Sequence, residues 1–118
     1  MSWNKGLLVA ALALANAHAH ATDHACPARH DGQPLSTGFV LDGPLERKAI
    51  LEADVDGVRR GVEFARWQVD YVYDAGRLVT LDCRYGADQV SAPVVVEARV
   101  KTCSYSKSKK RGVTLGCK

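Results

Sequence analysis

The stretch from Leu78 to Tyr85 constrains the fold more than any other part of the sequence, because its side chains alternate in character. An alternation with a period of two places successive side chains on opposite faces of an extended chain, which predicts a half-buried β-strand. The β-branched and aromatic residues of the apolar set suit a pleated surface that packs on one side. That apolar set consists of Val79, Leu81, Cys83 and Tyr85. The other set is mostly polar, so we expect it to face water.

The cysteines set the second constraint. The chain has four of them, Cys26, Cys83, Cys103 and Cys117. An even count in a short exported chain predicts two disulfides and an oxidising compartment. Zinc ligands usually come in closely spaced pairs, and these four cysteines are scattered along the chain. We therefore expect all four to be oxidised and no metal or cofactor to be bound.

The first 21 residues have the pattern of a secretory signal peptide. Lys5 supplies a positive charge, residues 7–15 form an apolar run too short to span a bilayer, and small residues up to Ala21 offer cleavage sites. We expect cleavage after Ala21. This leaves residues 22–118 as one soluble domain in the periplasm or outside the cell, with no membrane span.

A second alternating stretch, residues 67–73, predicts a strand that pairs with residues 78–85. The connection, residues 75–77, would be a short turn in which Gly76 adopts the left-handed conformation. The expected facing pairs are Tyr71 with Leu81, Val69 with Cys83, and Trp67 with Tyr85. In this register every inward side chain meets another inward side chain.

The next apolar stretch, residues 90–96, predicts a third strand that continues the buried face. Its register would place the small Ala92 beside Cys83, which leaves space for a disulfide partner. Pro93 cannot donate a hydrogen bond to a neighbouring strand, so we expect this strand at an edge of the sheet or bulged.

The first part of the mature chain gives weaker patterns. Residues 28–36 are polar without periodicity and predict a tether, whereas residues 38–41 predict a short strand. One or two helical turns are expected within residues 45–53. Arg59 and Arg60 precede a glycine in what we interpret as an exposed loop.

The last part of the chain predicts a hairpin centred on Lys110, with residues 108–112 as its loop. It would place Tyr105 opposite Leu115 and Cys103 opposite Cys117. Facing positions on neighbouring strands bring Cβ atoms close enough for a disulfide. We therefore favour the pairs Cys103–Cys117 and Cys26–Cys83, with Cys26–Cys117 and Cys83–Cys103 as the alternative.

These elements together predict a mainly β protein with little helix. We expect a small antiparallel sheet or sandwich of about five to six strands, held by two disulfides.

Several short motifs span almost the whole mature chain. They are Cys26-Pro27, Asp42-Gly43-Pro44, Trp67-x-Val69, Leu81-x-Cys83-x-Tyr85, Cys103-x-Tyr105 and the near-terminal Cys117. In these motifs the chain resembles a family of small exported proteobacterial proteins of unassigned function, known by a locus tag only. It departs from that family at Leu45, where the family has a second proline. The resemblance implies the disulfide framework. It also implies relatives among type VI secretion genes, where small periplasmic proteins serve as immunity partners of wall-attacking toxins.

Residues that usually carry catalysis are scarce in the mature chain. Its two histidines, His24 and His30, lie in the polar tether, and nothing in the sequence brings them near a serine with an acidic partner. Oxidised cysteines leave no thiolate nucleophile. We expect the acids Asp70, Asp74, Asp82 and Asp88 on the outer face or in turns, where they serve solubility. The sequence therefore predicts no catalytic residue and no enzymatic activity.

The hairpin tip is the most basic stretch of the chain. Its cations are Lys107, Lys109, Lys110 and Arg111. The formal net charge of the whole chain is only +3, which argues against a general or specific nucleic-acid binder. We expect a periplasmic protein-binding module, an inhibitor or immunity-type protein, whose tip contacts an acidic surface of a toxin or wall hydrolase. The alternative is an envelope protein that binds a polyanion, lipopolysaccharide or nucleic acid, with the same tip. A third interpretation is a solvated loop that only keeps the protein soluble.

Overall fold

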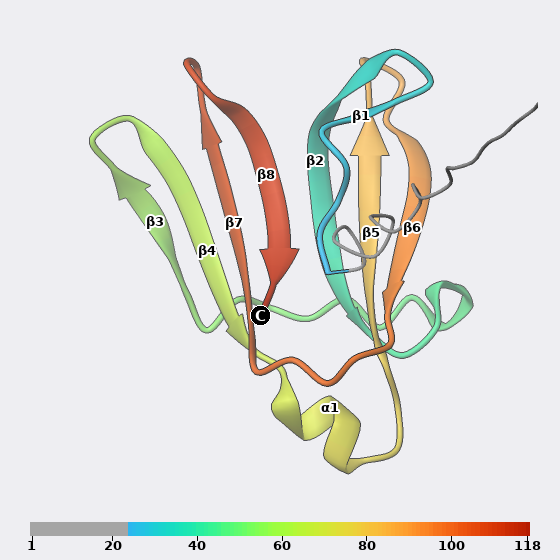
Figure 1. Ribbon diagram of the computed structural model, residues 1–118. Helices are drawn as coiled ribbons and strands as arrows, with labels where there is room; N and C mark the ends of the chain where they lie inside the picture. The colour runs from blue at the N-terminus through green and yellow to red at the C-terminus, as the bar shows by residue number, and fades with distance from the viewer. Residues whose placement is uncertain (1–23) are drawn as a thin grey trace, which may run out of the picture.

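The computed structural model describes residues 24–118, so the expected signal peptide and its cleavage site lie outside the described residues. The described chain forms two antiparallel four-stranded sheets (Figure 1). Sheet 1 has the order β1-β2-β5-β6, with β1 (Arg29–His30), β2 (Gln33–Asp42), β5 (Val79–Tyr85) and β6 (Val90–Val96). Sheet 2 has the order β3-β4-β7-β8, with β3 (Val55–Arg59), β4 (Val62–Gln68), β7 (Thr102–Ser108) and β8 (Gly112–Cys117). The prediction of a mainly β protein is confirmed, but residues 24–118 contain eight strands and not five to six.

The two sheets share one hydrophobic core where β8 lies over β2 (Figure 1). Buried side chains from both sheets belong to it, including Val40, Leu81 and Tyr85 from sheet 1, and Trp67, Cys103 and Leu115 from sheet 2. Gly38 permits the close approach of the sheets, because a Cβ atom at this position would lie 2.6 Å from Cδ2 of Leu115. A larger residue there would push the sheets apart.

The prediction for β5 is confirmed for its apolar face. It is wrong for the other face, which was expected to be exposed to water. Thr80 and Asp82 are buried, because β2 and β6 flank β5 on both sides. The Asp82 carboxylate accepts hydrogen bonds from Nε and Nη2 of Arg84, at 3.0 and 2.8 Å, and another from the Ser91 hydroxyl. Asp82 is therefore part of a paired buried network and not a solubilising surface acid.

The predicted strand over residues 67–73 is wrong after Gln68. The chain leaves sheet 2 there and forms α1 (Asp70–Asp74), which carries it across to sheet 1 (Figure 1). Val69 and Val72 are fully buried, and the Tyr73 hydroxyl donates to the Val96 carbonyl at 2.9 Å. Val72 and Tyr73, three and four residues after Val69, therefore face the core with it, as expected of a helix. The apolar residues of this stretch also alternate with its other residues, which is why the sequence predicted a strand.

The expected pairing of this stretch with β5 is consequently absent. Trp67 lies opposite Cys103 of β7, and the neighbours of β5 are β2 and β6. Gly76 does adopt the predicted left-handed conformation, with φ of 82°, but in the loop between α1 and β5.

The predicted tether over residues 28–36 is also wrong. Strands β1 and β2 form a hairpin through Asp31 and Gly32, whose φ angles of 51° and 77° are those of a type I′ turn. Residues 38–41 are therefore part of a ten-residue strand. The helical turns expected within residues 45–53 shrink to a short 3-10 turn, η2 (Leu45–Arg47).

The hairpin registers predicted for β5 with β6 and for β7 with β8 are confirmed. Ala92 lies beside Cys83, and β6, which contains Pro93, is an edge strand of sheet 1. In the β7–β8 hairpin, Tyr105 lies opposite Leu115 and Cys103 opposite Cys117. The favoured disulfides, Cys26–Cys83 and Cys103–Cys117, are both present. No helix within residues 24–118 has the length and apolar character needed to cross a bilayer.

Candidate binding surface on sheet 2

The predicted basic tip lies in the turn between β7 and β8. Lys109, Lys110 and Arg111 are exposed there, and the backbone N–H of Arg111 donates to the Ser108 hydroxyl at 3.0 Å, which shapes the turn. Lys107 is exposed too, but it belongs to β7, where side chains alternate between the two faces. It therefore lies on the opposite face of the sheet from Ser108.

A second hairpin brings another cation to the same end of sheet 2. Arg60 and Gly61 form the two-residue turn between β3 and β4, with φ angles of 55° and 78° that again mark a type I′ turn. Because β4 pairs with β7, and Glu63 lies opposite Lys107, the two hairpin turns lie at one end of the sheet (Figure 1). Arg60 is thus beside the predicted tip and not in an isolated loop.

We call this cluster the basic end. It consists of Arg60, Lys107, Lys109, Lys110 and Arg111. None of the ion pairs within residues 24–118 involves any of these side chains, and Glu63 forms no ion pair with its register partner Lys107. By contrast, Arg77, Arg84 and Arg99 elsewhere in the fold each pair with an aspartate. The cations of the basic end are therefore exposed and unpaired among the described residues, an arrangement that suits contact with an external anion.

A groove of about 700 Å³ separates the two hairpin turns. Its walls are Arg60 on one side and Lys109, Lys110 and Arg111 on the other. Its floor includes Val62, Ser106 and Ser108. These floor residues belong to the face of sheet 2 that is turned away from Trp67 and the core, which we call the outer face.

The outer face is hollowed further along β4 and β7. A second hollow of about 440 Å³ shares Val62 and Ser106 with the groove and continues to Arg66 and Ser104. The Arg59 guanidinium lies over the Phe64 ring on this face, 5.5 Å from its centroid. This contact holds the guanidinium of Arg59 above the sheet surface.

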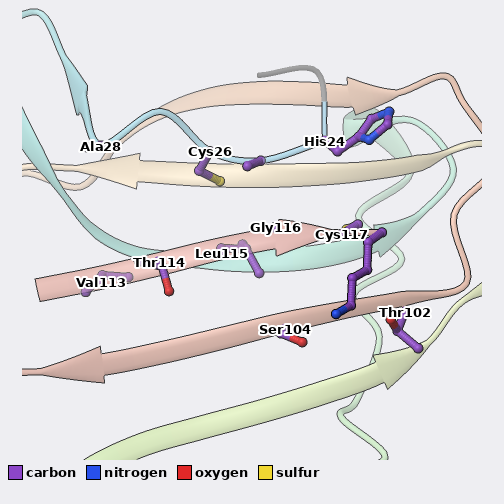
Figure 2. A pocket seen from close by; sticks show the side chains of 12 residues that line it. His24, Cys26, Ala28, Thr102, Ser104, Val113, Thr114, Leu115, Gly116 and Cys117 are labelled. Carbon is purple, nitrogen blue, oxygen red and sulfur yellow. The ribbon is translucent and has the colours of Figure 1, made fainter. Parts of the chain in front are cut away.

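A third hollow of about 590 Å³ lies between β8 and the N-terminal segment (Figure 2). The segment runs along β8 because the Cys117 N–H donates to the His24 carbonyl at 2.7 Å and the Cys26 N–H to the Leu115 carbonyl at 2.9 Å. Figure 2 shows Ser104 and Thr114 on the neighbouring strands below it. Since Ser104 also lines the second hollow, the two hollows form one continuous surface, which we call the outer trough.

The outer trough is lined by basic and hydroxyl side chains together with apolar ones, and by no acidic side chain among the described residues. Its basic side chains are His24, Arg59, Arg66 and Lys118, and its hydroxyl side chains include Thr102, Ser104, Ser106 and Thr114. Among the described residues that line the trough or the adjoining groove there is no aspartate or glutamate; Asp54 lines a smaller neighbouring hollow beside Arg66 and Thr102. The surface is suited to hydrogen bonding and to binding of anions.

The perturbed titratable groups lie elsewhere. The hydrogen bond from Arg77 lowers the pKa of the Asp42 carboxyl, and burial raises the pKa of the Tyr85 hydroxyl, which donates to the Pro27 carbonyl at 2.7 Å. Both groups belong to sheet 1 and serve its internal contacts. No group of three or more potential metal ligands exists within residues 24–118.

Sequence reasoning found the β7–β8 tip but missed the contribution of Arg59, Arg60 and Arg66. Their proximity to the tip depends on the pairing of β4 with β7, which are far apart in the sequence. The turn signal of Arg60-Gly61 was visible, but which strand lies beside this hairpin was not. In comparisons with known proteins, no family model matches the chain, and no curated protein or solved structure matches it either. The family resemblance noted from the sequence therefore stays a prediction.

Proposed function

We propose that the protein is an exported binding module that recognises an acidic surface of another protein through its basic end. It would act as an inhibitor or immunity-type protein for a cell-wall-targeting toxin or hydrolase. The observation that carries this proposal is the convergence of two hairpins, which place at one end of the domain five cations that form no ion pair with a described residue. The β7–β8 hairpin that carries four of them is paired up to Ser108 and Gly112 beside the tip and is closed at its other end by the Cys103–Cys117 disulfide, which limits the ordering required on binding.

Binding fits the arrangement better than catalysis. His30 packs against the Tyr85 ring, with centroids 5.3 Å apart, and lies on sheet 1 with Asp31 as its exposed neighbour. The cysteines are oxidised and cannot act as nucleophiles. The charged residues that line the groove between the two hairpin turns are cations suited to electrostatic recognition, which speeds association and aligns partners.

A triple variant tests the basic end directly. Lys109→Ala, Lys110→Ala and Arg111→Ala together should abolish capture of the partner in a pull-down from periplasmic extract, and wild-type capture should weaken as salt increases. The matched control removes three exposed cations away from the basic end, through Arg47→Ala, Lys48→Asn and Lys101→Ala. Asparagine is used at position 48 because Lys48 has a positive φ of 53°.

The control should retain the partner that the triple variant loses. Equal recovery by wild type and the triple variant would show that the tip is a solvated loop, and the proposal would then be wrong. A gene for a toxin with a wall-degrading domain next to this one would identify the partner to test first.

The second candidate function is binding of a polyanion. The specific observation in its favour is the absence of aspartate and glutamate from the described lining of the groove and the outer trough. A surface whose charged side chains are all basic suits a ligand with several negative charges better than it suits a protein with mixed charges.

A further inference from the structure

We propose that the outer trough is a separate binding site for a phosphorylated glycan carried on a lipid surface, of the lipid A type. This inference deepens the second candidate function, on which it rests, because it places the anion site on residues other than the basic end and names the class of ligand. It rests on three features of the trough, which are its arginines, its rows of hydroxyls and its open shape.

Two arginines supply the anion-binding part of the site. Arg59 and Arg66 are exposed residues of β3 and β4 whose side chains lie on the outer face, and neither forms an ion pair with a described residue. A guanidinium presents a planar set of donors that matches two oxygens of one phosphate. The Phe64 ring under Arg59 fixes one guanidinium above the surface before any ligand arrives.

Hydroxyl groups supply the part of the site that suits sugars. Every residue of β7 that lies on the outer face carries one, in the order Thr102, Ser104, Ser106 and Ser108. Alternate residues of a strand are about 7 Å apart, so the hydroxyls form a regular row along the trough. The Thr114 hydroxyl on β8 extends the row sideways and hydrogen-bonds Ser106 at 2.8 Å. Such groups both donate and accept, as sugar hydroxyls do.

The surface lacks the features that other polyanions or proteins require. Phe64 is the one phenylalanine, tyrosine or tryptophan whose side chain lies on the outer face of the described sheet, and Arg59 already covers it. Proteins that bind single-stranded nucleic acid stack successive bases on several aromatic rings. Protein interfaces rely on large apolar or aromatic anchors in pockets. The apolar side chains that line the trough besides Phe64 are mostly of small or medium size, such as Val62 and Val113, and they alternate with hydroxyl residues.

The shape of the trough points to a ligand held on a surface. Sites for free small molecules usually enclose most of the ligand in a deep cleft. The hollows of the trough are wide and open, and they extend across one face of a sheet. A flat face of this kind can approach headgroups that are displayed on a membrane, with arginines meeting the phosphates and hydroxyls meeting the sugar.

Co-sedimentation with vesicles tests the inference. Phosphatidylcholine vesicles that contain lipid A should bind the protein. Two other preparations should bind it poorly, namely vesicles with the same glycolipid lacking its phosphates, and vesicles with phosphatidylglycerol at equal phosphate content. The double variant Arg59→Gln, Arg66→Gln should weaken binding to lipid A by about tenfold or more, as expected for loss of charge-assisted hydrogen bonds. The control Arg47→Gln, Lys101→Gln should bind as wild type.

A second variant, Ser106→Ala with Thr114→Val, separates sugar recognition from charge attraction. It should weaken binding to lipid A vesicles and leave the weak binding to phosphatidylglycerol unchanged. Equal binding of the wild type to both anionic vesicles would overturn the inference, as would no binding to any vesicle or competition by a single-stranded oligonucleotide. Partner capture by the basic end is a separate measurement, so failure of either proposal leaves the other standing. Thermal unfolding of each variant shows that the fold is intact.

Discussion

Sheet 1 and sheet 2 each contain four strands, but they differ in whether their charged side chains form ion pairs. In sheet 1 and its connections, Asp42 pairs with Arg77 and Asp82 with Arg84, and both pairs are at least partly buried. In sheet 2, the cations of the basic end and of the outer trough have no ion-pair partner among the described residues. Paired charges stabilise a fold, whereas unpaired exposed cations contribute to association.

The two sheets also differ at their edge strands: an edge of sheet 1 is protected from pairing with another strand, whereas an edge of sheet 2 is exposed. Pro93 interrupts the hydrogen-bonding capacity of β6, the long edge strand of sheet 1, and so protects that edge from adventitious pairing. In sheet 2 all five residues of β3 are exposed, and no described strand pairs with its outer edge. The comparison suggests that sheet 1 is the stabilising half of the domain and sheet 2 is the half that presents binding groups.

The largest expected effect is that of the disulfides, which hold both halves. In the chain-entropy model, Cys26–Cys83 contributes about 4 kcal/mol and Cys103–Cys117 about 3 kcal/mol, against a typical total stability of about 5–15 kcal/mol. We therefore expect reduction to unfold the domain, measured by loss of near-ultraviolet circular dichroism. Without reductant, alkylation of the denatured exported protein should add no mass. Any labelled cysteine would contradict two complete bridges.

The two disulfides also differ in what they connect. Cys26 lies in the segment that bonds to β8, and its disulfide partner is on β5, so this bridge joins the two halves. Cys103–Cys117 lies within a single hairpin. Replacing the first pair by alanine should therefore cost more than replacing the second. The opposite order would show that the link between the two halves contributes less to stability than the bridge within the β7–β8 hairpin.

Trp67→Ala should have the next largest effect, because Trp67 is a large side chain that sheet 2 contributes to the core. Its side chain is 8% exposed, and its indole N–H donates to the Leu51 carbonyl at 3.1 Å. Removal of a buried large aromatic side chain costs about 3 to 5 kcal/mol. Urea unfolding followed by circular dichroism measures the loss, and an unchanged midpoint would show that Trp67 is not a core residue.

The sequence predicted those parts of the fold whose partners are close along the chain. The registers of β5–β6 and β7–β8 follow from alternation and from short turns, and both were predicted correctly. The pairing of β2 with β5 depends on contacts between distant segments, which no local pattern contains. The prediction for residues 67–73 was wrong for another reason, since the spacing of their apolar side chains fits both the period of a strand and that of a helix.

The same limit applies to the candidate site. The tip residues Lys109, Lys110 and Arg111 form a run that is visible in the sequence, but the outer trough is assembled from β3, β4, β7, β8 and the N-terminal segment. The absence of aspartate and glutamate from its described lining becomes apparent only when these strands lie side by side. The burial of Asp82 could not be predicted either, because it depends on the strands that flank β5.

Asp82→Ala should have a smaller effect than Trp67→Ala but a clear one. The substitution leaves the partly buried Arg84 guanidinium and the Ser91 hydroxyl without their acceptor. Loss of a buried hydrogen-bond partner costs about 1–3 kcal/mol. Chemical unfolding measures it, and Asp88→Ala, in the exposed loop before β6, is the matched control with no expected change. Equal stability of both variants would show that sheet 1 gains nothing from its buried pair.

The smallest expected effect is a dependence of stability on pH that belongs to sheet 1 alone. Arg77 donates two hydrogen bonds to the Asp42 carboxylate, at 2.5 and 2.9 Å, and these lower the pKa of Asp42 below its usual range. A carboxyl whose pKa is lower in the folded state stabilises the fold above its unfolded pKa, about 3.9, and loses this contribution as the pH falls through the folded pKa. Arg77→Gln should therefore destabilise the protein at neutral pH, and the difference from wild type should shrink below about pH 4.

Replacing Lys109, Lys110 and Arg111 by alanine should change the unfolding free energy by less than about 0.5 kcal/mol at either pH, because exposed loop cations without partners contribute little to stability. If this triple variant reproduced the pH-dependent loss of Arg77→Gln, the tip would be paired in solution, and the contrast between a stabilising sheet and a presenting sheet would be wrong.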